Sequence, residues 1–373
     1  MKVTVISRGI PKQNDPIYGI FEFNQAIALT KKGVDVAFIA IDFRGFAAKR
    51  KYGLFQYECQ GVHVFELSLP INRYRKNIPI LQRLFLIPFR AMLKSFGKPD
   101  IVHAHFYKIG AIASIIKKKY DIPFVITEHR SIFNEPIDKI GYYHKRSIKQ
   151  AFPYCDLLIS VSEALHDNIL KNFGFDSIVI PNVVDNQSFH YKGLSKSTSP
   201  FIFVSLGNFI PRKGFDQLIS AFSKVKDDAL LYIIGEGPLR EDLEAQIRQL
   251  GLQEQVTLFG RIETSEEIND IFQRCNVFAL SSVSETFGVV YIEAMCAGLP
   301  VIATRCGGPE FFVTESDGIV VPVNDTESLV EAMKDIRKNY SNYHPQQISE
   351  ATIERFSYNT IASKLLAAYS TIL

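Results

Sequence analysis

The chain has 373 residues, of which 47% are hydrophobic and 22% charged, and its formal net charge is +3. This length predicts two domains, and the hydrophobic content is ordinary for a soluble globular protein. No run of about 18 uncharged apolar residues occurs, so we expect no membrane-spanning helix. The N-terminal run Met1–Ser7 has the pattern of a strand and not of a signal peptide, because it is short and no small-residue cleavage site follows it.

The five cysteines are scattered and lack the spacing of a metal site. This pattern is typical of reduced, mostly buried thiols and predicts a cytoplasmic protein. The charges are distributed unevenly: residues 1–187 contain 26 lysines and arginines against 16 acidic residues, a net of +10, whereas residues 188–373 contain 16 against 23, a net of −7. The basic half indicates an anionic partner, such as a membrane surface, a phosphorylated acceptor or a nucleic acid.

The first half of the chain alternates short strands with amphipathic helices. Runs rich in valine and isoleucine predict strands at residues 3–7, 36–41, 62–67, 101–105, 124–127, 157–161 and 178–180, and helices are predicted at 21–32, 109–119 and 163–172. Strands that are apolar along nearly their whole length are typical of parallel sheets covered by helices on both faces.

The second half repeats this pattern, with strands predicted at residues 201–206, 230–234, 256–259, 277–280, 301–303 and 319–321. A serine-rich stretch, residues 186–200, separates the halves. We therefore predict an α/β protein with two Rossmann-like domains built on parallel sheets. The N-terminal domain spans 1–185, the linker 186–200 and the C-terminal domain 201–355.

Two glutamates bracket a predicted strand-to-helix loop in the second half. Glu285 follows the strand, and Glu293 lies about one turn inside a helix at 289–297 that Gly298 ends. Ligands of doubly wound sheets bind at such loops, because helix N-termini present unpaired N–H groups. The two acids either accept hydrogen bonds from sugar or ribose hydroxyls or form an ordinary solvated pair, and this stretch alone favours neither.

Ligand-type residues also follow other strands of this half. Arg212 and Lys213 are suited to clamp a diphosphate, the arginine by its fork and the lysine as a point charge. Each remaining loop is a weak signal by itself: 235–238, 259–261 and 307–310. Five successive strand ends that carry such residues indicate a ligand site.

Together these motifs resemble the donor-binding half of glycosyltransferase family 4, whose members have the GT-B fold and transfer a sugar from a nucleotide-sugar with retention of anomeric configuration. Pro-Asn-Val-Val-Asp at 181–185 is similar to the family's Pro-Asn-Gly-Val-Asp, and Phe-Ser-Tyr at 356–358 resembles its Phe-Ser-Trp. The resemblance implies two domains facing an interdomain cleft and a C-terminal helix, 356–373, that crosses back to the N-terminal domain. It also implies a hexosyltransferase-type enzyme of polysaccharide biosynthesis that acts on a glycan or lipid-linked acceptor.

The resemblance implies a role for each motif residue. Arg212 and Lys213 bind the donor diphosphate and neutralise the leaving group. Glu293 binds the ribose hydroxyls, and Glu285 holds hydroxyls of the transferred sugar. The other donor-binding residues are Gly207, Gly235, Arg261, Phe287, Gly288 and Glu310, with Phe287 and Gly288 acting through their amides and Arg261 near the base.

The first domain contains fewer matches. Gly19 lies where the family has a glycine-rich loop, on the acceptor or phosphate side. His105, at a strand end, matches the family histidine near the reacting sugar, so we place it with Arg212, Lys213 and Glu285 among the catalytic residues. His129, at the next strand end, is assigned to the acceptor or phosphate side. A core or rim histidine is the alternative interpretation of both.

No Asp-x-Asp motif occurs in the chain, although many metal-dependent sugar transferases use that motif to hold a divalent ion. Its absence agrees with charge neutralisation by Arg212 and Lys213. We therefore expect no metal and no cofactor, the nucleotide-sugar being a substrate.

Residues 72–98 form a basic segment rich in leucine, isoleucine and phenylalanine. One interpretation is an amphipathic helix on an anionic membrane surface, which places a cytoplasmic protein peripherally on the inner face of the membrane. The alternative is an ordinary sheet-covering helix with a solvated basic face.

Two other functions fit much of this pattern. A nucleotide-sugar epimerase of the same fold is one, and a sugar-nucleotide-binding module without turnover is another, although intact Arg212, Lys213 and paired glutamates disfavour the module. A nucleic-acid partner is not expected, because the basic charges are scattered and no binding motif occurs.

Overall fold

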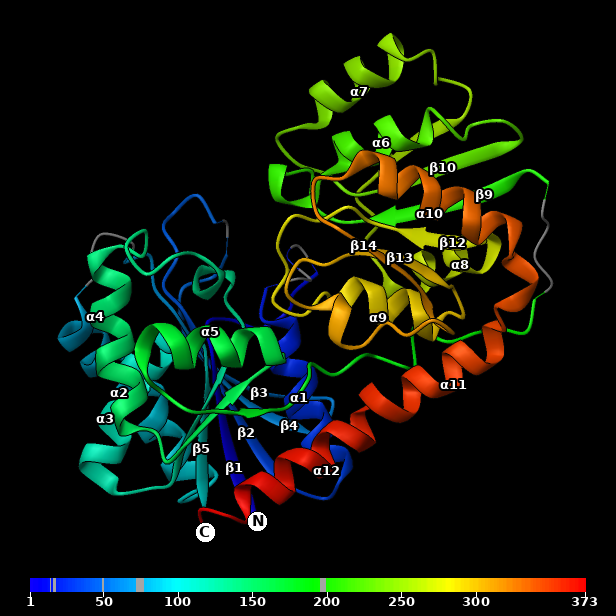
Figure 1. Ribbon diagram of the computed structural model, residues 1–373. Helices are drawn as coiled ribbons and strands as arrows, with labels where there is room; N and C mark the ends of the chain where they lie inside the picture. The colour runs from blue at the N-terminus through cyan, green and yellow to red at the C-terminus, as the bar shows by residue number, and fades with distance from the viewer. Residues whose placement is uncertain (14, 16–17, 49, 72–76, 195–198) are drawn as a thin grey trace. The chain divides into compact units, whose positions relative to one another are not determined.

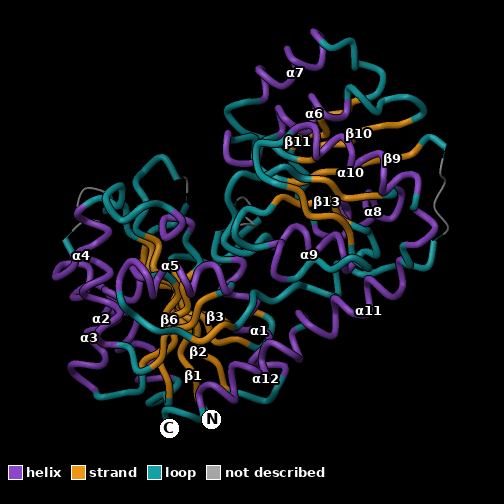
Figure 2. Tube along the Cα trace, viewed as in Figure 1, coloured by secondary structure: helices purple, strands orange, loops and turns teal. Residues whose placement is uncertain are grey.

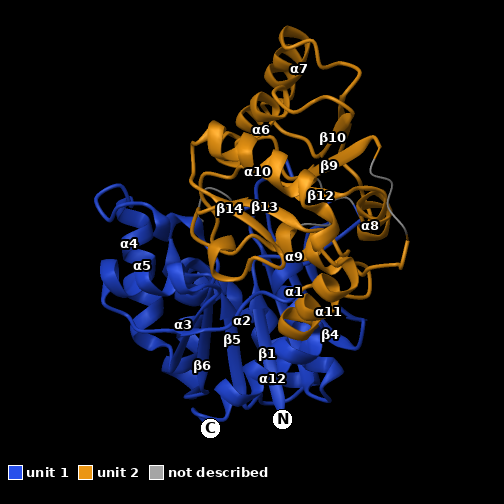
Figure 3. Ribbon diagram, turned by 45° about the vertical axis from the view of Figure 1, so that its right-hand side comes forward, with its two compact units in different colours: residues 1–183, 358–373 blue, residues 184–357 orange. Residues whose placement is uncertain are grey.

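The computed structural model describes all residues except 14, 16–17, 49, 72–76 and 195–198. It contains two compact units, unit 1 (Met1–Val183 and Tyr358–Leu373) and unit 2 (Val184–Ser357) (Figure 3). The residues predicted as a linker, 186–200, fall within unit 2, and 195–198 of them lie outside the described residues. Each unit is built on a sheet of mainly parallel strands with helices, so the predicted α/β fold class is confirmed.

Unit 1 contains, among its described residues, a sheet with the strand order β3-β4-β2-β1-β5-β6-β7-β8. The strands are β1 (Lys2–Ser7), β2 (Asp35–Asp42), β3 (Gly53–Cys59), β4 (Val62–Ser68), β5 (Ile101–His105), β6 (Phe124–Glu128), β7 (Leu157–Ser160) and β8 (Ile178–Val179). All pair in parallel except β3, which is antiparallel to β4. The sequence did not predict β3, because this edge strand is largely exposed and has no apolar run.

Helices cover both faces of this sheet (Figures 1 and 2). One face packs against α1 (Ile20–Lys31) and α12 (Tyr358–Tyr369), and the other against α2 (Ile78–Ser95) and α3 (Tyr107–Tyr120). Helix α4 (Tyr142–Ala151) packs against α3. The helix α5 (Glu163–Phe173) lies between β7 and β8 in the chain. It begins after Ser162, whose hydroxyl accepts a hydrogen bond from the Leu165 N–H, and it ends at the left-handed Gly174.

The C-terminal helix α12 is part of the core of unit 1. Ile361, Leu365 and Tyr369 are fully buried among residues of α1 and of the central strands. Full burial of one large apolar side chain contributes roughly 1.5–3 kcal/mol. The Tyr369 hydroxyl also hydrogen-bonds to Nδ1 of His103 in β5, at 2.6 Å. The last helix therefore stabilises the sheet that carries the predicted histidines.

Helix α2 accounts for the described part of the basic segment, and residues 72–76 of that segment lie outside the described residues. Its apolar side chains, including Phe85, Phe89 and Met92, are buried in unit 1. The opposite side exposes Arg83 and Arg90. The helix therefore covers the sheet with its apolar face. No helix of the described ranges is both long enough and apolar enough to cross a membrane.

Unit 2 contains a parallel sheet with the order β11-β10-β9-β12-β13-β14 in its described part. The strands are β9 (Phe201–Leu206), β10 (Ala229–Ile234), β11 (Val256–Gly260), β12 (Val277–Ala279), β13 (Val301–Thr304) and β14 (Gly318–Val321). The helices are α6 (Phe215–Phe222), α7 (Arg240–Gln249), α8 (Ser265–Arg274), α9 (Val289–Cys296), α10 (Thr326–Lys338) and α11 (Pro345–Phe356). Helix α6 packs against α7 and α10, and α9 packs against α11.

Each sheet reverses its strand order at one place. The reversal lies between β1 and β5 in unit 1 and between β9 and β12 in unit 2. Ligands of open α/β sheets bind outside the carboxyl ends of the strands at this reversal, because the flanking loops diverge there to opposite faces. The two reversals therefore mark where a site is expected in each unit.

Candidate active site

The reversal of unit 2 carries an ion-paired cluster. Lys213 ends a single 3-10 turn after β9 (Pro211–Lys213), and its Nζ lies 2.6 Å from Oε1 of Glu285 in the loop after β12. Nη1 of Arg212 lies 3.8 Å from the other carboxylate oxygen. Glu285 is only 6% exposed, and its Oε1 also accepts a hydrogen bond from the Ser282 hydroxyl at 2.8 Å. Three residues that the sequence predicted at two separate strand ends are thus in contact.

Backbone contacts fix the two loops that carry this cluster. The Val283 N–H donates to the Arg212 carbonyl at 2.8 Å, and the Arg212 guanidinium donates to the Ser284 carbonyl at 3.0 Å. Gly214 has a φ of +64°, and a side-chain carbon there would lie 2.2 Å from the Ser281 carbonyl oxygen. The close approach requires glycine at this position. The two cations are therefore held by rigid loops beside Glu285.

Glu293 belongs electrostatically to the same cluster. It is partly buried in α9, which begins after the left-handed Gly288. Burial and then the negative charge of Asp185 raise the pKa of Glu293 to about 7, against the opposing effect of Lys213. Lys213 therefore acts on both predicted glutamates, through an ion pair with Glu285 and through its charge on Glu293.

Two of the predicted residues, Phe287 and Glu310, make contacts that stabilise the loops in which they lie. The Phe287 side chain is buried against Phe312 and Phe356, and the residue as a whole is only 4% exposed. The Glu310 carboxylate accepts hydrogen bonds from the N–H groups of Gly307 and Gly308, at 2.9 and 3.0 Å. Glu310 thus shapes the turn after β13.

The remaining predicted donor residues lie at the ends of β9, β10 and β11. A side-chain carbon on Gly235 would lie 1.9 Å from the Gly207 carbonyl oxygen, so the absence of a side chain at Gly235 allows these two loops to pack. Arg261 is 42% exposed, and its Nε lies 3.6 Å from Glu263. Among the described residues, Arg261 forms no ion pair with the cluster around Lys213.

In unit 1, the histidines at the ends of β5 and β6 form a buried stack. The ring of His105 lies 4.6 Å from that of His103 and 5.2 Å from that of His129, centroid to centroid. Nδ1 of His105 is 2.9 Å from Nε2 of His129. The two histidines that the sequence singled out are therefore directly hydrogen-bonded.

Burial keeps these rings neutral. It lowers the pKa of His103 to about 3, and burial followed by nearby positive charge lowers the pKa of His129 to about 3. The pKa of His105 is well below its ordinary value, because of burial and then of its two histidine neighbours. Within the described residues, the buried Nε2 of His105 has no hydrogen-bond partner. A buried polar atom of this kind is suited to a ligand hydroxyl.

Gly19, the third predicted residue of unit 1, precedes α1 with a φ of +86°. A side-chain carbon there would lie 2.3 Å from the Gly9 carbonyl oxygen. Gly19 is therefore required where the loop after β1 passes the start of α1, and no contact places it in a ligand site.

Glu128 organises the strand ends of unit 1, although sequence reasoning assigned it no separate role. Its carboxylate accepts hydrogen bonds from the N–H groups of Tyr107, His129 and Arg130, at 2.7, 2.9 and 2.9 Å. Burial raises the pKa of Glu128 to about 7 despite these bonds. Its position at the end of a buried strand was the signal available in the sequence.

Arg8 was also missed, because one arginine after a strand forms no motif. Its guanidinium lies 4.5 Å from the centre of the Phe106 ring, and its Nε is 3.4 Å from Glu22. Phe106 itself has a φ of 67°, an uncommon conformation for a bulky residue. No group of three or more histidine, cysteine or acidic residues is placed to hold a metal ion in the described part of the chain.

Two family descriptions match the chain. Residues 186–355 match "Glycosyl transferases group 1", and residues 23–188 match "Glycosyltransferase Family 4". Together these matches span nearly the whole chain. The chain belongs to glycosyltransferase family 4.

Similar proteins agree with this assignment. The chain is 25% identical over 399 residues to the putative teichuronic acid biosynthesis glycosyltransferase TuaC of Bacillus subtilis, which covers 98% of this chain and 94% of that protein. It is 26% identical over 310 residues, 76% of this chain and 80% of the relative, to the N-acetylgalactosamine-N,N'-diacetylbacillosaminyl-diphospho-undecaprenol 4-alpha-N-acetylgalactosaminyltransferase of Campylobacter jejuni.

Solved structures share the fold. Sucrose-phosphate synthase from Thermosynechococcus elongatus matches with a TM-score of 0.81 and 19% identity, over 100% of this chain and 98% of that one. Anabaena HepE in complex with UDP matches with a TM-score of 0.73 and 17% identity, over 99% of both chains. The fold is GT-B. The protein is a glycosyltransferase that takes its sugar from a nucleotide-sugar donor, and neither the epimerase nor the binding-module alternative is favoured.

Proposed function

We propose that the protein is a retaining, metal-independent glycosyltransferase that moves a sugar from a nucleotide-sugar to a glycan or lipid-linked acceptor. The observation that carries the proposal is the cluster at the carboxyl ends of β9 and β12. There Lys213 and Arg212 flank the buried carboxylate of Glu285, at 2.6 and 3.8 Å. Two fixed cations at a strand-order reversal are the arrangement that a donor diphosphate requires.

In this proposal Arg212 and Lys213 bind the diphosphate. An ammonium group has three N–H donors, and the Glu285 carboxylate takes one of those of Lys213. The two positive charges stabilise the negative charge that grows on the leaving group, which supports transfer without a divalent ion. Glu293 accepts hydrogen bonds from the ribose hydroxyls.

Retention follows from a reaction on one face of the sugar. Glu285 accepts hydrogen bonds from Lys213 and Ser282, which suits it to orient sugar hydroxyls better than to attack the anomeric carbon. The departing diphosphate then takes the proton of the acceptor hydroxyl on the same face. The Nε2 of His105 hydrogen-bonds to the reacting sugar.

The protein docks on an anionic membrane in this proposal. The outer side of α2 exposes Arg83, Arg90 and Lys94, while its apolar side is buried in unit 1. Each basic side chain near such a surface contributes roughly 1 kcal/mol, and salt screens this attraction. Attachment is therefore electrostatic and reversible. Vesicle co-sedimentation tests it: binding to anionic but not neutral vesicles supports docking, and no binding to anionic vesicles contradicts it.

A donor screen tests the catalytic proposal. UDP-, GDP- and ADP-sugars are incubated with candidate acceptors, with and without excess EDTA, and nucleotide release is measured. We expect release that depends on acceptor and persists in EDTA, and a product whose anomeric ¹H coupling matches that of the donor. Loss of turnover in EDTA with recovery in Mg²⁺ contradicts metal independence. An inverted coupling contradicts retention, and sugar isomerisation without transfer supports an epimerase.

A further inference from the structure

Unit 1 contains a cavity of about 590 Å³ at its own strand-order reversal, and Arg8 lies in its wall. The described lining includes no aspartate or glutamate, and its basic side chains are Arg8, Arg44, Lys108, Arg130 and Arg146. The apolar floor comes from α2, α3 and the end of β2: Ile41, Ile78, Leu81, Ile109 and Ile112. The contacts of Arg8 link this wall to the pair of histidines at the ends of β5 and β6.

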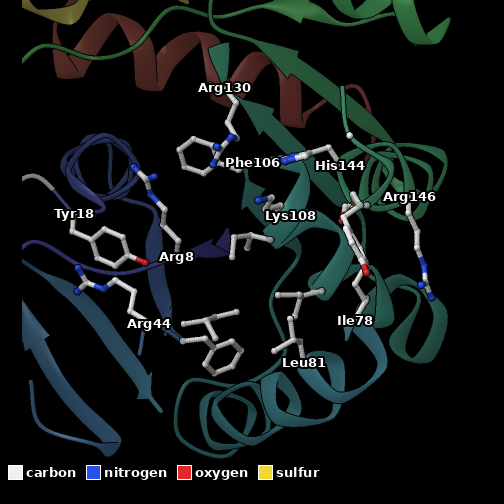
Figure 4. Close-up of a pocket in the computed structure, with 17 residues that line it drawn as sticks. Arg8, Tyr18, Arg44, Ile78, Leu81, Phe106, Lys108, Arg130, His144 and Arg146 are labelled. Carbon is white, nitrogen blue, oxygen red and sulfur yellow. The ribbon is translucent and has the colours of Figure 1, made fainter. Parts of the chain in front are cut away.

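The Arg8 guanidinium lies between two aromatic rings. Its Cζ is 4.5 Å from the centre of the Phe106 ring and 5.4 Å from that of the Tyr18 ring. Figure 4 shows the Arg8 side chain between those of Tyr18 and Phe106. Both distances are in the range of cation–π interactions. The cation therefore links the loop after β1, which carries Tyr18, to Phe106 at the end of β5.

Phe106 in turn lies between Arg8 and the histidine pair. Its ring is 4.9 Å from the ring of His129, whose Nε2 is 2.9 Å from Nδ1 of His105. Phe106 has a φ of 67°, and a bulky residue keeps such a conformation only where its surroundings hold it in place. Because Arg8 and His129 both pack on the Phe106 ring, the position of His129 depends on Arg8.

A buried carboxylate fixes Arg8 itself. Glu22, in the first turn of α1, is fully buried, and its Oε1 lies 3.4 Å from Nε of Arg8 and accepts a hydrogen bond from the Ser7 hydroxyl at 3.1 Å. Burial raises the pKa of Glu22, and the charge of Arg8 opposes this shift. Among the described residues, Arg8 is the only cation that forms an ion pair with Glu22. Glu22 therefore anchors the guanidinium from the side of α1.

The position of His129 has a chemical consequence for His105. Burial keeps both rings neutral, so in the contact between them one nitrogen donates and the other accepts. The direction of this hydrogen bond decides whether Nε2 of His105 carries the hydrogen, and so whether it donates to a ligand or accepts from it. After burial, the charge of Arg8 is the next cause that lowers the pKa of His129. Arg8 thus acts on His129 through packing and through charge.

We propose that Arg8 is a positioning residue of the transfer reaction, which fixes the place and the tautomer of His105 through Phe106 and His129. The bond from Nε2 of His105 to the reacting sugar rests on the proposed function, whereas the arrangement of the two rings does not. Arg8 does not touch the reacting atoms. Its removal therefore slows transfer and leaves donor binding on unit 2 unchanged.

A kinetic double-mutant cycle tests whether Arg8 acts through Phe106. Arg8→Met, Phe106→Leu and the double variant are compared with wild type in kcat and in the KM of the donor. Each single variant should lower kcat by about 10-fold at constant KM, less than the roughly 10²-fold that a 1 Å misplacement costs. The double variant should lose no more than either single variant. Losses that multiply to about 100-fold overturn the proposal, as does a normal kcat for Arg8→Met.

The matched control of this cycle is Lys118→Met. Lys118 also packs on an aromatic ring, since its Nζ lies 4.0 Å from the centre of the Tyr154 ring, but it belongs to the last turn of α3. It should keep full kcat. Circular dichroism checks the fold of every variant, and if Arg8→Met does not fold, Glu22→Gln is added to every member of the cycle. This change removes the buried carboxylate that would otherwise lose its cation.

Ring ¹⁵N NMR of the histidines at pH 7 tests the positioning without any substrate. The variant is Arg8→Met/Glu22→Gln, with Phe106→Leu in its place if the former does not fold. We expect one tautomer each for His105 and His129 in wild type and a mixture in the variant, with the exposed His63 of β4 unchanged. A folded variant with the wild-type tautomers overturns the proposal. If wild type transfers no sugar from any nucleotide donor, the proposed function fails, and the NMR comparison alone decides the positioning.

Discussion

The two strand-order reversals of this protein have similar architecture and different chemistry. In unit 2, the cations at the reversal face a carboxylate, and the Lys213 Nζ lies 2.6 Å from Glu285. In unit 1, the cavity has five basic side chains and no acidic one in its described lining, above an apolar floor. In unit 2, Glu285 neutralises part of the positive charge, so the cluster suits a ligand that has both hydroxyls and phosphates. In unit 1, the basic lining has no acidic residue, so the cavity favours a ligand whose negative charge is concentrated at one end.

The largest expected effect is at the cluster of unit 2. Lys213→Ala should lower turnover by about 10²–10³, the loss that follows removal of one preorganised charge stabiliser. The fold should persist, because Lys213 ends a short turn and lies outside the core clusters. Steady-state kinetics measure the turnover, and a circular dichroism spectrum checks the fold. Lys224→Ala, an exposed lysine of unit 2 paired with Glu327, is the control and should keep full turnover. A Lys213→Ala enzyme with near-normal turnover contradicts the diphosphate assignment.

Acid should destabilise unit 1 more than unit 2. The pKa values of His103 and His129 are lowered to about 3, so below their ordinary value near 6.5 the unfolded chain binds more protons and stability falls as pH falls. At pH 5 each of these two histidines lowers the free energy of unfolding by about 2 kcal/mol. Glu128 and Glu293, whose pKa values are raised to about 7, act oppositely: the stability they contribute is lost as pH rises toward 7.

Amide hydrogen exchange at pH 7 and pH 5, corrected for the intrinsic rate at each pH, resolves the two units. We expect protection to fall in peptides of β5 and β6 and to be kept in those of β9 and β12. Equal losses in both units are the contrary outcome.

A smaller effect is expected where the C-terminal helix meets the histidine stack. Tyr369→Phe removes the hydroxyl that bonds Nδ1 of His103 at 2.6 Å and leaves a buried polar atom without its partner. The cost is about 1–3 kcal/mol in the free energy of unfolding. Urea unfolding followed at 222 nm measures it, and the control Tyr142→Phe, an exposed residue, should be neutral. An unchanged midpoint for Tyr369→Phe contradicts the role of this bond.

The smallest expected effect separates the two glutamates of unit 2. Glu293→Gln should weaken nucleoside diphosphate binding by about 10-fold, the loss of roughly one strong hydrogen bond. Glu285→Gln removes the partner of Lys213, so nucleoside diphosphate binding should be unchanged or tighter while transfer falls. Calorimetric titration of both variants compares them. Equal weakening of plain nucleotide binding in the two variants contradicts the division of roles.

Sequence reasoning singled out the candidate site of unit 2 because its residues occur in motifs. Arg212 and Lys213 are adjacent, and Glu285 and Glu293 bracket one loop, so each pair is visible along the chain. The parallel strands then bring the two loops together at the reversal. The sequence did not reveal that Glu310 holds its own turn or that Phe287 is buried, because such roles depend on three-dimensional neighbours.

The cavity of unit 1 could not be predicted in the same way. Arg8, Arg44, Arg130 and Arg146 lie far apart in the sequence. The first three follow three different strands, and Arg146 lies on α4. Basic residues are usually solvated, so composition indicated a basic half without indicating a basic cavity. The edge strand β3 was missed for a related reason, since its exposed side chains give no apolar run.

The most direct test of a donor site on unit 2 is nucleotide stabilisation of wild type, Lys213→Ala and Arg146→Ala. Thermal unfolding is measured by circular dichroism, because the chain has no tryptophan, with UDP, GDP and ADP each in excess. A ligand that binds the native state raises the melting temperature by mass action. We predict that one of these nucleotides stabilises wild type and Arg146→Ala equally and Lys213→Ala much less. Equal stabilisation of Lys213→Ala, or its loss in Arg146→Ala, contradicts a donor site built on unit 2.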